Sequence, residues 1–287
     1  MPALKTITQL PVLPPRPEDS NKGDFGRILI VAGSRGMSGA AVLCGSAALR
    51  SGAGLVYVAV PESIQPIIGG ANPCYLTAAL PEDEQGLLSA EAAPALLKLA
   101  EGKHVLAVGP GLGRGPGISS LIAALLTQVP LPLVLDADGL NAVGQDTGRF
   151  KGRKAPLIIT PHPGEFARLI GSDIKTVQAQ RQELAVRFAA EHDIVVVLKG
   201  YGTLVTDGRR LFRNLTGNPG MATGGTGDVL TGLIAALVGQ HLEPFAAAQL
   251  GVYLHGLAGD LARDDLGEVS LIANDLLDYL PRAFRHF

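Results

Sequence analysis

Short apolar runs alternate with helix-like segments along the first two thirds of the chain. The run Arg27–Gly33 ends in glycine and has the continuous apolar character of a strand that is buried on both faces. The next segment, Ser38–Ser51, has the small-residue pattern of a helix packed closely on a sheet. Strands and helices that alternate at this spacing indicate βαβ units and a parallel sheet. Further strands are predicted at Leu55–Val60, His104–Gly109, Pro132–Ala137, Leu157–Thr160 and Ile194–Lys199, and helices at Ala90–Ala100, Ile118–Thr127 and Thr176–His192.

The alternation then stops. The segment Thr203–Asn214 predicts a hairpin of two short strands, and the chain from Gly227 to about Leu280 is mostly helical in pattern. At the other end, residues 1–21 are rich in proline and predict an extended segment. We therefore expect residues 22–287 to form a single domain of the α/β class, with a doubly wound, mostly parallel sheet covered by helices on both faces.

Composition narrows the classes of protein to which the chain can belong. It has 24 Lys+Arg against 26 Asp+Glu, a net charge of −2, so there is no basic excess with which to bind nucleic acid. Hydrophobic residues make up 47% and charged residues 17% of the sequence, which excludes an intrinsically disordered chain. Glycine occurs at 37 of 287 positions. Much of the backbone must therefore take positive φ or pass close to another group.

Other features of the sequence predict a cytoplasmic protein without a membrane segment. The N-terminus lacks the apolar stretch of a signal peptide. The uncharged stretch Gly115–Leu135 contains prolines and divides into a helix-like and a strand-like half, so we expect a buried helix–strand unit there rather than a transmembrane helix. The two cysteines, Cys44 and Cys74, are too few for a disulfide framework and lack metal-binding spacing, which is typical of a reducing compartment.

Polar, glycine-rich loops follow the predicted strands. Any one of them could be a tight turn and nothing more. However, the carboxyl ends of parallel strands meet at one edge of a sheet, so together these loops predict a ligand site at that edge. The loops are GSRGMSGA, GPGLGRGPG, DADGLN, TPHPGE, KGYGT and NPGMATGGTGD.

The last of these loops, Asn218–Asp228, opens an uncharged helical run. Its glycines leave backbone N–H groups unshielded at a helix start, where the helix dipole favours a phosphate, and we predict an anion hole at Gly225, Thr226 and Gly227. Asp228 beside it could take the proton of a hydroxyl that attacks a phosphoryl group. The alternative is that Thr226 is an ordinary N-cap and Asp228 only complements the dipole. The chain has neither a G-x-x-x-x-G-K-[ST] loop nor a G-x-G-x-x-G fingerprint, so phosphate handling is left to this turn.

The tetrapeptide Gly225-Thr226-Gly227-Asp228 resembles the GxGD signature of the ribokinase-like superfamily, in which the aspartate is the catalytic base. Within that superfamily the chain resembles the ADP-dependent (S)-NAD(P)H-hydrate dehydratase family, because the matching segments occur in family order from Lys22 to about Leu237. They include KGDFGRILIVAGSRGMSGAAVL, ALRSGAGLV, VGPGLGR, VLDADGLN, TPHPGEFARL, LKGYGTLV and NPGMATGGTGDVLTGLIAAL.

The resemblance implies a reaction and a set of roles. The substrates of the family are NADHX and NADPHX, hydrated forms of NADH and NADPH that carry a hydroxyl on the reduced ring. ADP (or ATP) with Mg²⁺ phosphorylates that hydroxyl, phosphate leaves and NAD(P)H is restored, so the enzyme is a carbon–oxygen lyase that converts ADP to AMP. Asp228 would be the base. The hydrate would contact Ala40 or Ala41, Gly113, His162 and Asp228, and the adenine nucleotide would lie along Lys199, Gly200, Tyr201, Gly202 and Thr203 and against Gly227.

Four polar residues in the DADGLN and TPHPGE loops have more than one possible role. Asp136 and Asp138 follow a buried strand and could hold Mg²⁺ or bond to a substrate hydroxyl, although Asp138 could equally cap a short helix. Glu165 falls where related kinases carry an Asn-x-x-Glu motif that helps to organise Mg²⁺, and it is our candidate metal ligand. His162 replaces the Asn of that motif, and in the family pattern this departure marks a dehydratase rather than a kinase. The alternative for His162, taken on its own, is a surface histidine in a proline-rich turn.

Lys199 and His255 are the last two residues for which the sequence gives an expectation. The charge of Lys199 could offset nucleotide phosphate, or the side chain could only reach solvent. His255 is expected to be a packed core or interface histidine.

A small-molecule kinase of the hydroxymethylpyrimidine or hydroxyethylthiazole type is the alternative enzyme, and a nucleotide sensor, which would not need Asp228, is the alternative of another class. The resemblance also implies a homotetramer and a functional link to a separate NAD(P)H-hydrate epimerase.

Overall fold

One mixed sheet runs through the middle of the molecule in the computed structural model, which describes residues 4–151, 153 and 155–287. Its order, β1-β10-β9-β8-β7-β6-β5-β2-β3-β4, places the earliest long strand near one end and the hairpin near the other. Only β9, among the strands of the described residues, runs antiparallel to its neighbours. The strands are β1 (Lys5–Thr6), β2 (Arg27–Val31), β3 (Leu55–Pro61), β4 (Leu76–Leu80), β5 (Val105–Val108), β6 (Leu133–Leu135), β7 (Leu157–Ile159), β8 (Val195–Leu198), β9 (Leu204–Thr206) and β10 (Arg210–Arg213).

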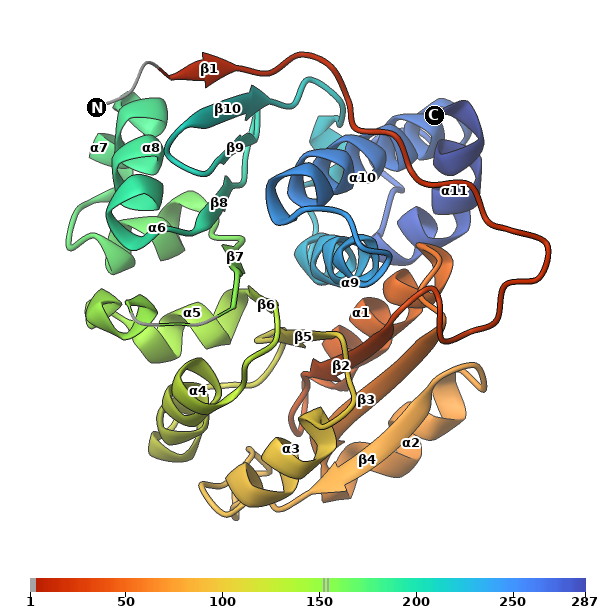
Figure 1. The fold of residues 1–287 in the computed structure, drawn as a ribbon, viewed down its shortest axis with the longest axis vertical. Coiled ribbons are helices and arrows are strands. Elements are labelled where there is room, and N and C mark those ends of the chain that lie inside the picture. The colour runs from red at the N-terminus through yellow and green to blue at the C-terminus, as the bar shows by residue number, and fades with distance from the viewer. Residues whose placement is uncertain (1–3, 152, 154) are drawn as a thin grey trace.

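Helices cover both faces of this sheet (Figure 1). One face carries α1 (Ser38–Arg50), α2 (Gln65–Ala71), α9 (Thr226–Gly239), α10 (Pro244–Leu266) and α11 (Ala273–His286). The other face carries α3 (Ala92–Ala100), α4 (Pro116–Gln128), α5 (Ala137–Val143), α6 (Pro163–Leu169), α7 (Ile174–Ala179) and α8 (Arg181–His192). Three short 3₁₀ turns, η1 (Glu62–Ile64), η2 (Thr147–Phe150) and η3 (Pro219–Met221), complete the described elements.

Strand β2 shows why the apolar runs are continuous. Ile28 and Ile30 lie in the core beneath α1 and α9, whereas Leu29 and Val31 lie in the core beneath α3 and α4. All four side chains are fully buried. Because successive side chains of a strand point to opposite faces, a strand covered on both sides needs an apolar residue at every position.

The α/β class, the mostly parallel sheet and the hairpin are confirmed, but two details of the prediction are wrong. The expected helix Thr176–His192 is two helices, because Gln180 leaves the helical conformation (φ −125°, ψ 31°) and α8 restarts at Arg181. In addition, α2 and β4 were not predicted. Strand β4 lies at the sheet edge and its Leu76 is 45% exposed, so its pattern lacks the continuous apolar run of the buried strands.

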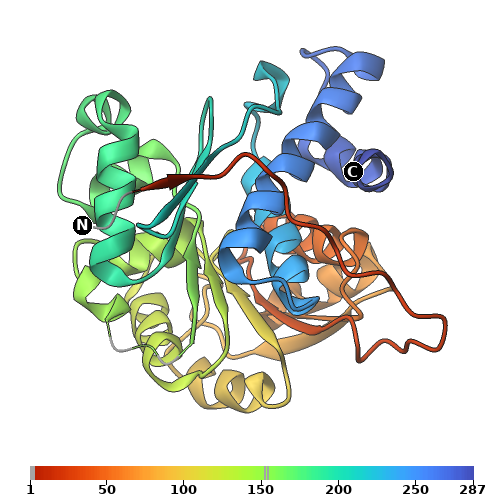
Figure 2. The same ribbon diagram turned by 45° about the horizontal axis from the view of Figure 1, so that its top comes forward.

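The N-terminal segment is extended, as its prolines indicated. It pairs β1 with β10 in parallel, Lys5 opposite Arg210, and then crosses α10 on its way to β2, as Figures 1 and 2 show. Gln249 of α10 donates a hydrogen bond to the Gln9 carbonyl at 2.8 Å, and Arg16 donates one to the Gly52 carbonyl at 2.6 Å. The stretch Gly115–Leu135 forms α4 and β6, and no helix within the described ranges is long and apolar enough to cross a bilayer.

Candidate active site

The carboxyl ends of the central strands bring polar residues from distant parts of the chain together. Asp136 follows β6 directly and Lys199 follows β8 directly, while His162 comes shortly after β7. The N-terminus of α9 lies against the same group, because a Cβ added at Gly227 would lie 3.2 Å from Lys199 Nζ and 3.9 Å from Asp136 Oδ2. The loop cluster that the sequence predicted at this edge of the sheet is therefore present in the structure.

A buried ion pair lies at the base of this cluster. Lys199 Nζ donates to Asp136 Oδ1 at 2.9 Å, and the Asp136 side chain is only 1% exposed. The hydroxyl of Thr231, on α9, donates to the other carboxylate oxygen at 2.9 Å. Burial on its own would lower the pKa of Lys199, but the carboxylates of Asp136 and Glu165 outweigh burial and the pKa is raised. Lys199 is thus a fixed ammonium rather than a side chain that reaches solvent.

Helix α9 begins in the conformation that a phosphate site needs. Gly225 is its N-cap with φ +93°, and a Cβ there would lie 2.5 Å from Leu43 Cδ1, so only glycine fits. Thr226 is the first helical residue and its hydroxyl donates to the Thr223 carbonyl; the alternative that Thr226 is the N-cap is therefore wrong. Within the described residues, the backbone N–H groups of Gly225, Thr226 and Gly227 find no acceptor. These three donors are available to an anion.

Asp228 lies beside these free amides. Burial, followed by the nearby charge of Asp136, raises the pKa of Asp228 from 3.8 to about 7, although the ammonium of Lys199 opposes the rise. No side-chain hydrogen bond of Asp228 is found across the part of the chain that the structure describes. A carboxylate with a pKa near neutrality and free lone pairs is suited to accept a proton from a substrate.

His162 and Glu165 form the N-terminal cap of α6. His162 Nδ1 accepts the N–H groups of Gly164 and Glu165 at 3.0 and 3.3 Å, and Glu165 Oε2 accepts the backbone N–H of His162 at 2.8 Å. Burial and the charge of Lys199 lower the pKa of His162, which fits a neutral ring whose Nδ1 is an acceptor. The side chain of His162 is 51% exposed whereas that of Glu165 is 6% exposed. His162 therefore faces the open side of the site, and Glu165 lies behind it.

Asp138 holds the glycine loop that follows β5. Its Oδ2 accepts the N–H of Gly113 at 2.9 Å and its Oδ1 accepts the side-chain amide of Asn141 at 3.0 Å. Asp138 lies inside α5, whose N-cap position is Asp136, so Asp138 is not the cap that the sequence allowed. Both acids of the DADGLN loop are thus already engaged by protein groups.

Of the two alanines predicted as alternative contacts to the hydrate, only Ala40 is accessible to solvent. Ala41 is fully buried, whereas Ala40 is half-buried in the first turn of α1 and lies close to Gly111 in the same glycine loop as Gly113. The expectation of a contact by Ala41 is not compatible with its burial, and Ala40 remains as the candidate.

A cavity of about 440 Å³ adjoins the free amides of α9. It is lined by all of the predicted nucleotide segment, by the start of α9, by the loop that follows β10 and by α10. Its lining residues are Lys199, Gly200, Tyr201, Gly202, Thr203, Asn214, Thr216, Gly217, Asn218, Pro219, Met221, Ala222, Thr226, Gly227, Leu230, Val252, His255 and Gly256.

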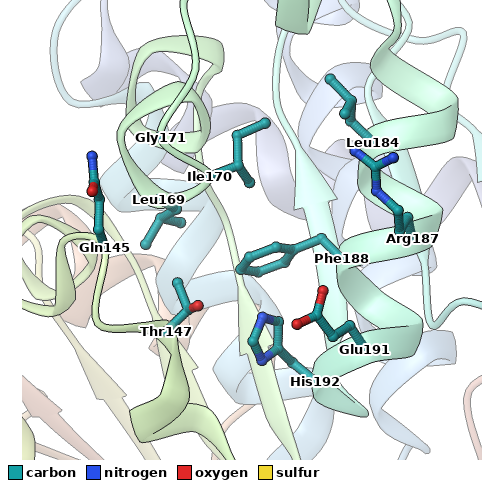
Figure 3. A pocket seen from close by; sticks show the side chains of 10 residues that line it. All are labelled: Gln145, Thr147, Leu169, Ile170, Gly171, Leu184, Arg187, Phe188, Glu191 and His192. Atoms are coloured by element: carbon teal, nitrogen blue, oxygen red, sulfur yellow. The ribbon is translucent and has the colours of Figure 1, made fainter.

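A second cavity, of about 340 Å³, is separate from this site. Figure 3 shows Phe188, Glu191 and His192 of α8 facing Leu169 of α6 and Thr147 of η2 across it. None of the predicted site residues lines it. The cavity lies toward the carboxyl ends of α6 and α8, whereas His162 caps the amino end of α6.

Several residues of the site were not predicted from the sequence. Thr231 had no motif to mark it, although it is one helical turn from Gly227 and its hydroxyl also lies 3.2 Å from the Gly227 carbonyl. Asn214 and Thr216 line the cavity from the segment just before the predicted loop Asn218–Asp228, which has no strong periodicity. His255, expected to be a packed core or interface residue, instead lines the cavity and lies 2.9 Å from the Thr226 carbonyl.

Comparison with known proteins agrees with this geometry. The family model described as NAD(P)H-hydrate dehydratase matches residues 28–282. A bifunctional NAD(P)H-hydrate repair enzyme from Moorella thermoacetica is 48% identical over 96% of this chain, which spans only 52% of that relative. An ADP-dependent (S)-NAD(P)H-hydrate dehydratase from Bacillus subtilis is 37% identical over 96% of this chain and 95% of its own length.

Solved structures lead to the same family. The crystal structure of the ADP/ATP-dependent NAD(P)H-hydrate dehydratase from Bacillus subtilis, co-crystallised with ATP and Mg²⁺, superposes with a TM-score of 0.83 and 35% identity over 96% of this chain and 94% of that one. The chain spans about half the length of the bifunctional relatives and nearly the full length of the Bacillus protein. With its ribokinase-like fold, its GTGD turn and its match over residues 28–282, the chain belongs to the NAD(P)H-hydrate dehydratase family.

Proposed function

We propose that this chain catalyses the ADP-dependent dehydration of (S)-NAD(P)H hydrate, with ADP converted to AMP and phosphate. The observation that carries the proposal is the pairing of the Asp228 carboxylate, free of side-chain hydrogen bonds among the described residues, with the free amides of residues 225–227. A base beside an anion hole is the arrangement that phosphoryl transfer to a hydroxyl requires.

The first step is transfer of a phosphoryl group from the nucleotide to the ring hydroxyl. Asp228 accepts the hydroxyl proton as the oxygen attacks the terminal phosphorus, and the amides of Gly225, Thr226 and Gly227 stabilise the charge on the transferring group. Lys199, held in place by Asp136, adds a fixed positive charge next to Gly227. In the second step the ring nitrogen supplies electrons as the carbon–oxygen bond breaks and phosphate leaves, which gives an iminium ion. Loss of a proton from the adjacent ring carbon then forms the carbon–carbon double bond and restores NAD(P)H.

The two substrates approach from opposite sides of Asp228. The 440 Å³ cavity is our proposed nucleotide site, because it lies between Lys199–Thr203 and the first turn of α9 and so brings the nucleotide phosphates to the free amides. We place the hydrated nicotinamide near Ala40, Gly113 and His162, because the side chain of His162 is 51% exposed there and Asp138 fixes the Gly113 loop.

The carboxylates around Asp228 are consistent with a Mg²⁺ ion carried by the nucleotide. The charges of Asp136, Asp138 and Glu165 all act on Asp228, with Lys199 as the cation that opposes them. The described residues contain no ready-made group of three metal-ligating side chains, but Mg²⁺ on a nucleotide needs only one or two protein carboxylates besides phosphates and water. Glu165 is the proposed contributor, and the ion would neutralise charge on the phosphates when bound.

Incubation of the protein with NADHX and ADP tests the proposal. Absorbance of the reduced nicotinamide should return, with one phosphate and one AMP formed for each NADH. A sugar- or vitamin-type kinase of the same superfamily would instead phosphorylate hydroxymethylpyrimidine or hydroxyethylthiazole, so those compounds are run in parallel. Absence of recovered absorbance with either ADP or ATP would contradict the proposal.

We further propose that residues 22–287 act as one domain and that the chain assembles as a homotetramer. The epimerase that would convert (R)-hydrate to the (S)-form is proposed to be a separate activity. Sedimentation measurements test the homotetramer and epimerase assays on the purified chain test the separate epimerase activity, both independently of the dehydratase assay.

A further inference from the structure

His255 is the one histidine among the described residues that lines the 440 Å³ cavity, and the proposed chemistry does not use it. It projects from α10 toward the start of α9, where its Nε2 lies 2.9 Å from the Thr226 carbonyl oxygen. A carbonyl can only accept, so Nε2 must carry the proton in this contact. Burial lowers the pKa of His255 to about 4, so the ring is neutral at physiological pH.

The Thr226 carbonyl belongs to the peptide group whose N–H is that of Gly227. Because a peptide group is planar, its C=O and N–H point in opposite directions, and a bond that fixes one fixes the other. A carbonyl in the first turn of a helix accepts one intrahelical N–H, and His255 supplies a second donor from a neighbouring helix. The residues on either side of Thr226 are glycines, whose backbone torsions are the least restrained.

We propose that His255 is a positioning residue that aims the Gly227 N–H into the anion hole by holding the Thr226 carbonyl. This inference rests on the proposed function, since it assigns a role within the same phosphoryl-transfer site. Helix α10 is a suitable support for this role. The next residue, Gly256, packs so closely on Thr216 that a Cβ there would lie 2.3 Å from its hydroxyl oxygen, and Asp260 accepts the Gly217 N–H at 2.8 Å.

Two substitutions of similar polarity separate a positioning role from a packing role. The amide of His255→Gln can place an N–H donor near the position of Nε2, whereas the shorter amide of His255→Asn cannot reach the Thr226 carbonyl. The control is Gln249→Leu, which removes a side-chain donor from the same helix to the Gln9 carbonyl, outside the cavity. Turnover is measured with NADHX and ADP, and hydrogen exchange is measured over residues 223–230.

We expect His255→Asn to lower kcat about tenfold, with the KM for the hydrate changed by less than about twofold and with faster exchange at the start of α9. His255→Gln should stay within about threefold of the native kcat, and Gln249→Leu should leave kcat unchanged. If His255→Asn keeps the native kcat and exchange, or if Gln and Asn are equally impaired, the positioning role is wrong. A native chain without dehydratase activity would instead contradict the proposed function, and the exchange measurement would still test the contact.

Discussion

Lys199 and Asp136 are joined by a 2.9 Å ion pair that lies next to the start of α9. Both charges act on Asp228, the carboxylate of Asp136 by raising its pKa and the ammonium of Lys199 by lowering it. The raising effects, with burial first among them, prevail and leave the pKa of Asp228 at about 7. The ion pair therefore helps to set the proton affinity of the proposed base without touching it.

Substitution of Asp228 tests its role as the base. Asp228→Asn should lower kcat by about 10²- to 10⁴-fold, because the amide cannot accept the hydroxyl proton. Affinity for ADP, measured by calorimetry, should be retained, since the free amides of residues 225–227 remain in place. The matched control is Asp264→Asn, an exposed acid of α10 outside the cavity, and turnover of Asp228→Asn close to the native value would show that Asp228 is not the base.

The pH dependence of turnover follows from the pKa of Asp228. Below pH 7 this carboxyl is protonated and cannot act as a base, so log(kcat/KM) should rise with pH and level off above about pH 7. Affinity for ADP is measured over the same range, which separates this effect from titration of the nucleotide. A profile that is flat between pH 5.5 and 8.5 would contradict the assignment.

The same pKa shift predicts that Asp228 destabilises the fold at neutral pH. Between pH 3.8 and 7 the folded chain keeps a proton on Asp228 that the unfolded chain has lost, so the free energy of unfolding falls as pH rises through this range. Asp228→Asn removes this loss and should be more stable than the native chain by on the order of 1–4 kcal/mol at pH 8. At pH 3.5 the difference should vanish. Urea unfolding at both pH values measures it, and a destabilised variant at pH 8 would contradict the raised pKa.

The fold was largely predictable because each central strand is buried on both faces and is therefore a continuous apolar run in the sequence. Ile28 to Val31 are apolar without interruption because each face of β2 is covered. The convergence of the loops was predictable for a similar reason, since parallel strands gather their carboxyl ends at one edge. The edge strand β4 was not predicted, because its residues are partly exposed and do not form a continuous apolar run.

The contacts within the site were not predictable, because they join residues far apart in the chain. Thr231 and Asp136 are 95 positions apart, and no local pattern marks the hydroxyl that bonds to the carboxylate. The pKa of Asp228 depends on the same distant neighbours. His255 meets Thr226 only because α10 packs on α9, so the sequence alone offered no means of distinguishing it from a core histidine.

Glu165 can be tested as a metal ligand separately from its role as a cap. Glu165→Gln keeps an oxygen that can accept the His162 N–H, and therefore the cap of α6, but loses the negative charge. If Glu165 helps to hold nucleotide-bound Mg²⁺, the Mg²⁺ concentration for half-maximal turnover should rise about tenfold while the melting temperature changes little. Magnesium titrations of the native chain and the variant measure this effect, and an unchanged Mg²⁺ dependence would leave Glu165 as a capping residue only.

Removal of one partner of the Lys199–Asp136 pair should cost more stability than removal of both charges. Lys199→Met leaves the Asp136 carboxylate, which is 1% exposed, without its cation, and we expect a loss of about 3–5 kcal/mol in the free energy of unfolding. In the double variant Lys199→Met, Asp136→Asn, the neutral amide still offers an oxygen to the Thr231 hydroxyl, so roughly half of this loss should be recovered. Urea unfolding of the two single variants and the double variant at pH 7.5 gives the coupling energy. If the losses of the single variants simply add in the double variant, the two charges are not coupled, and Lys199 is not held in place by Asp136.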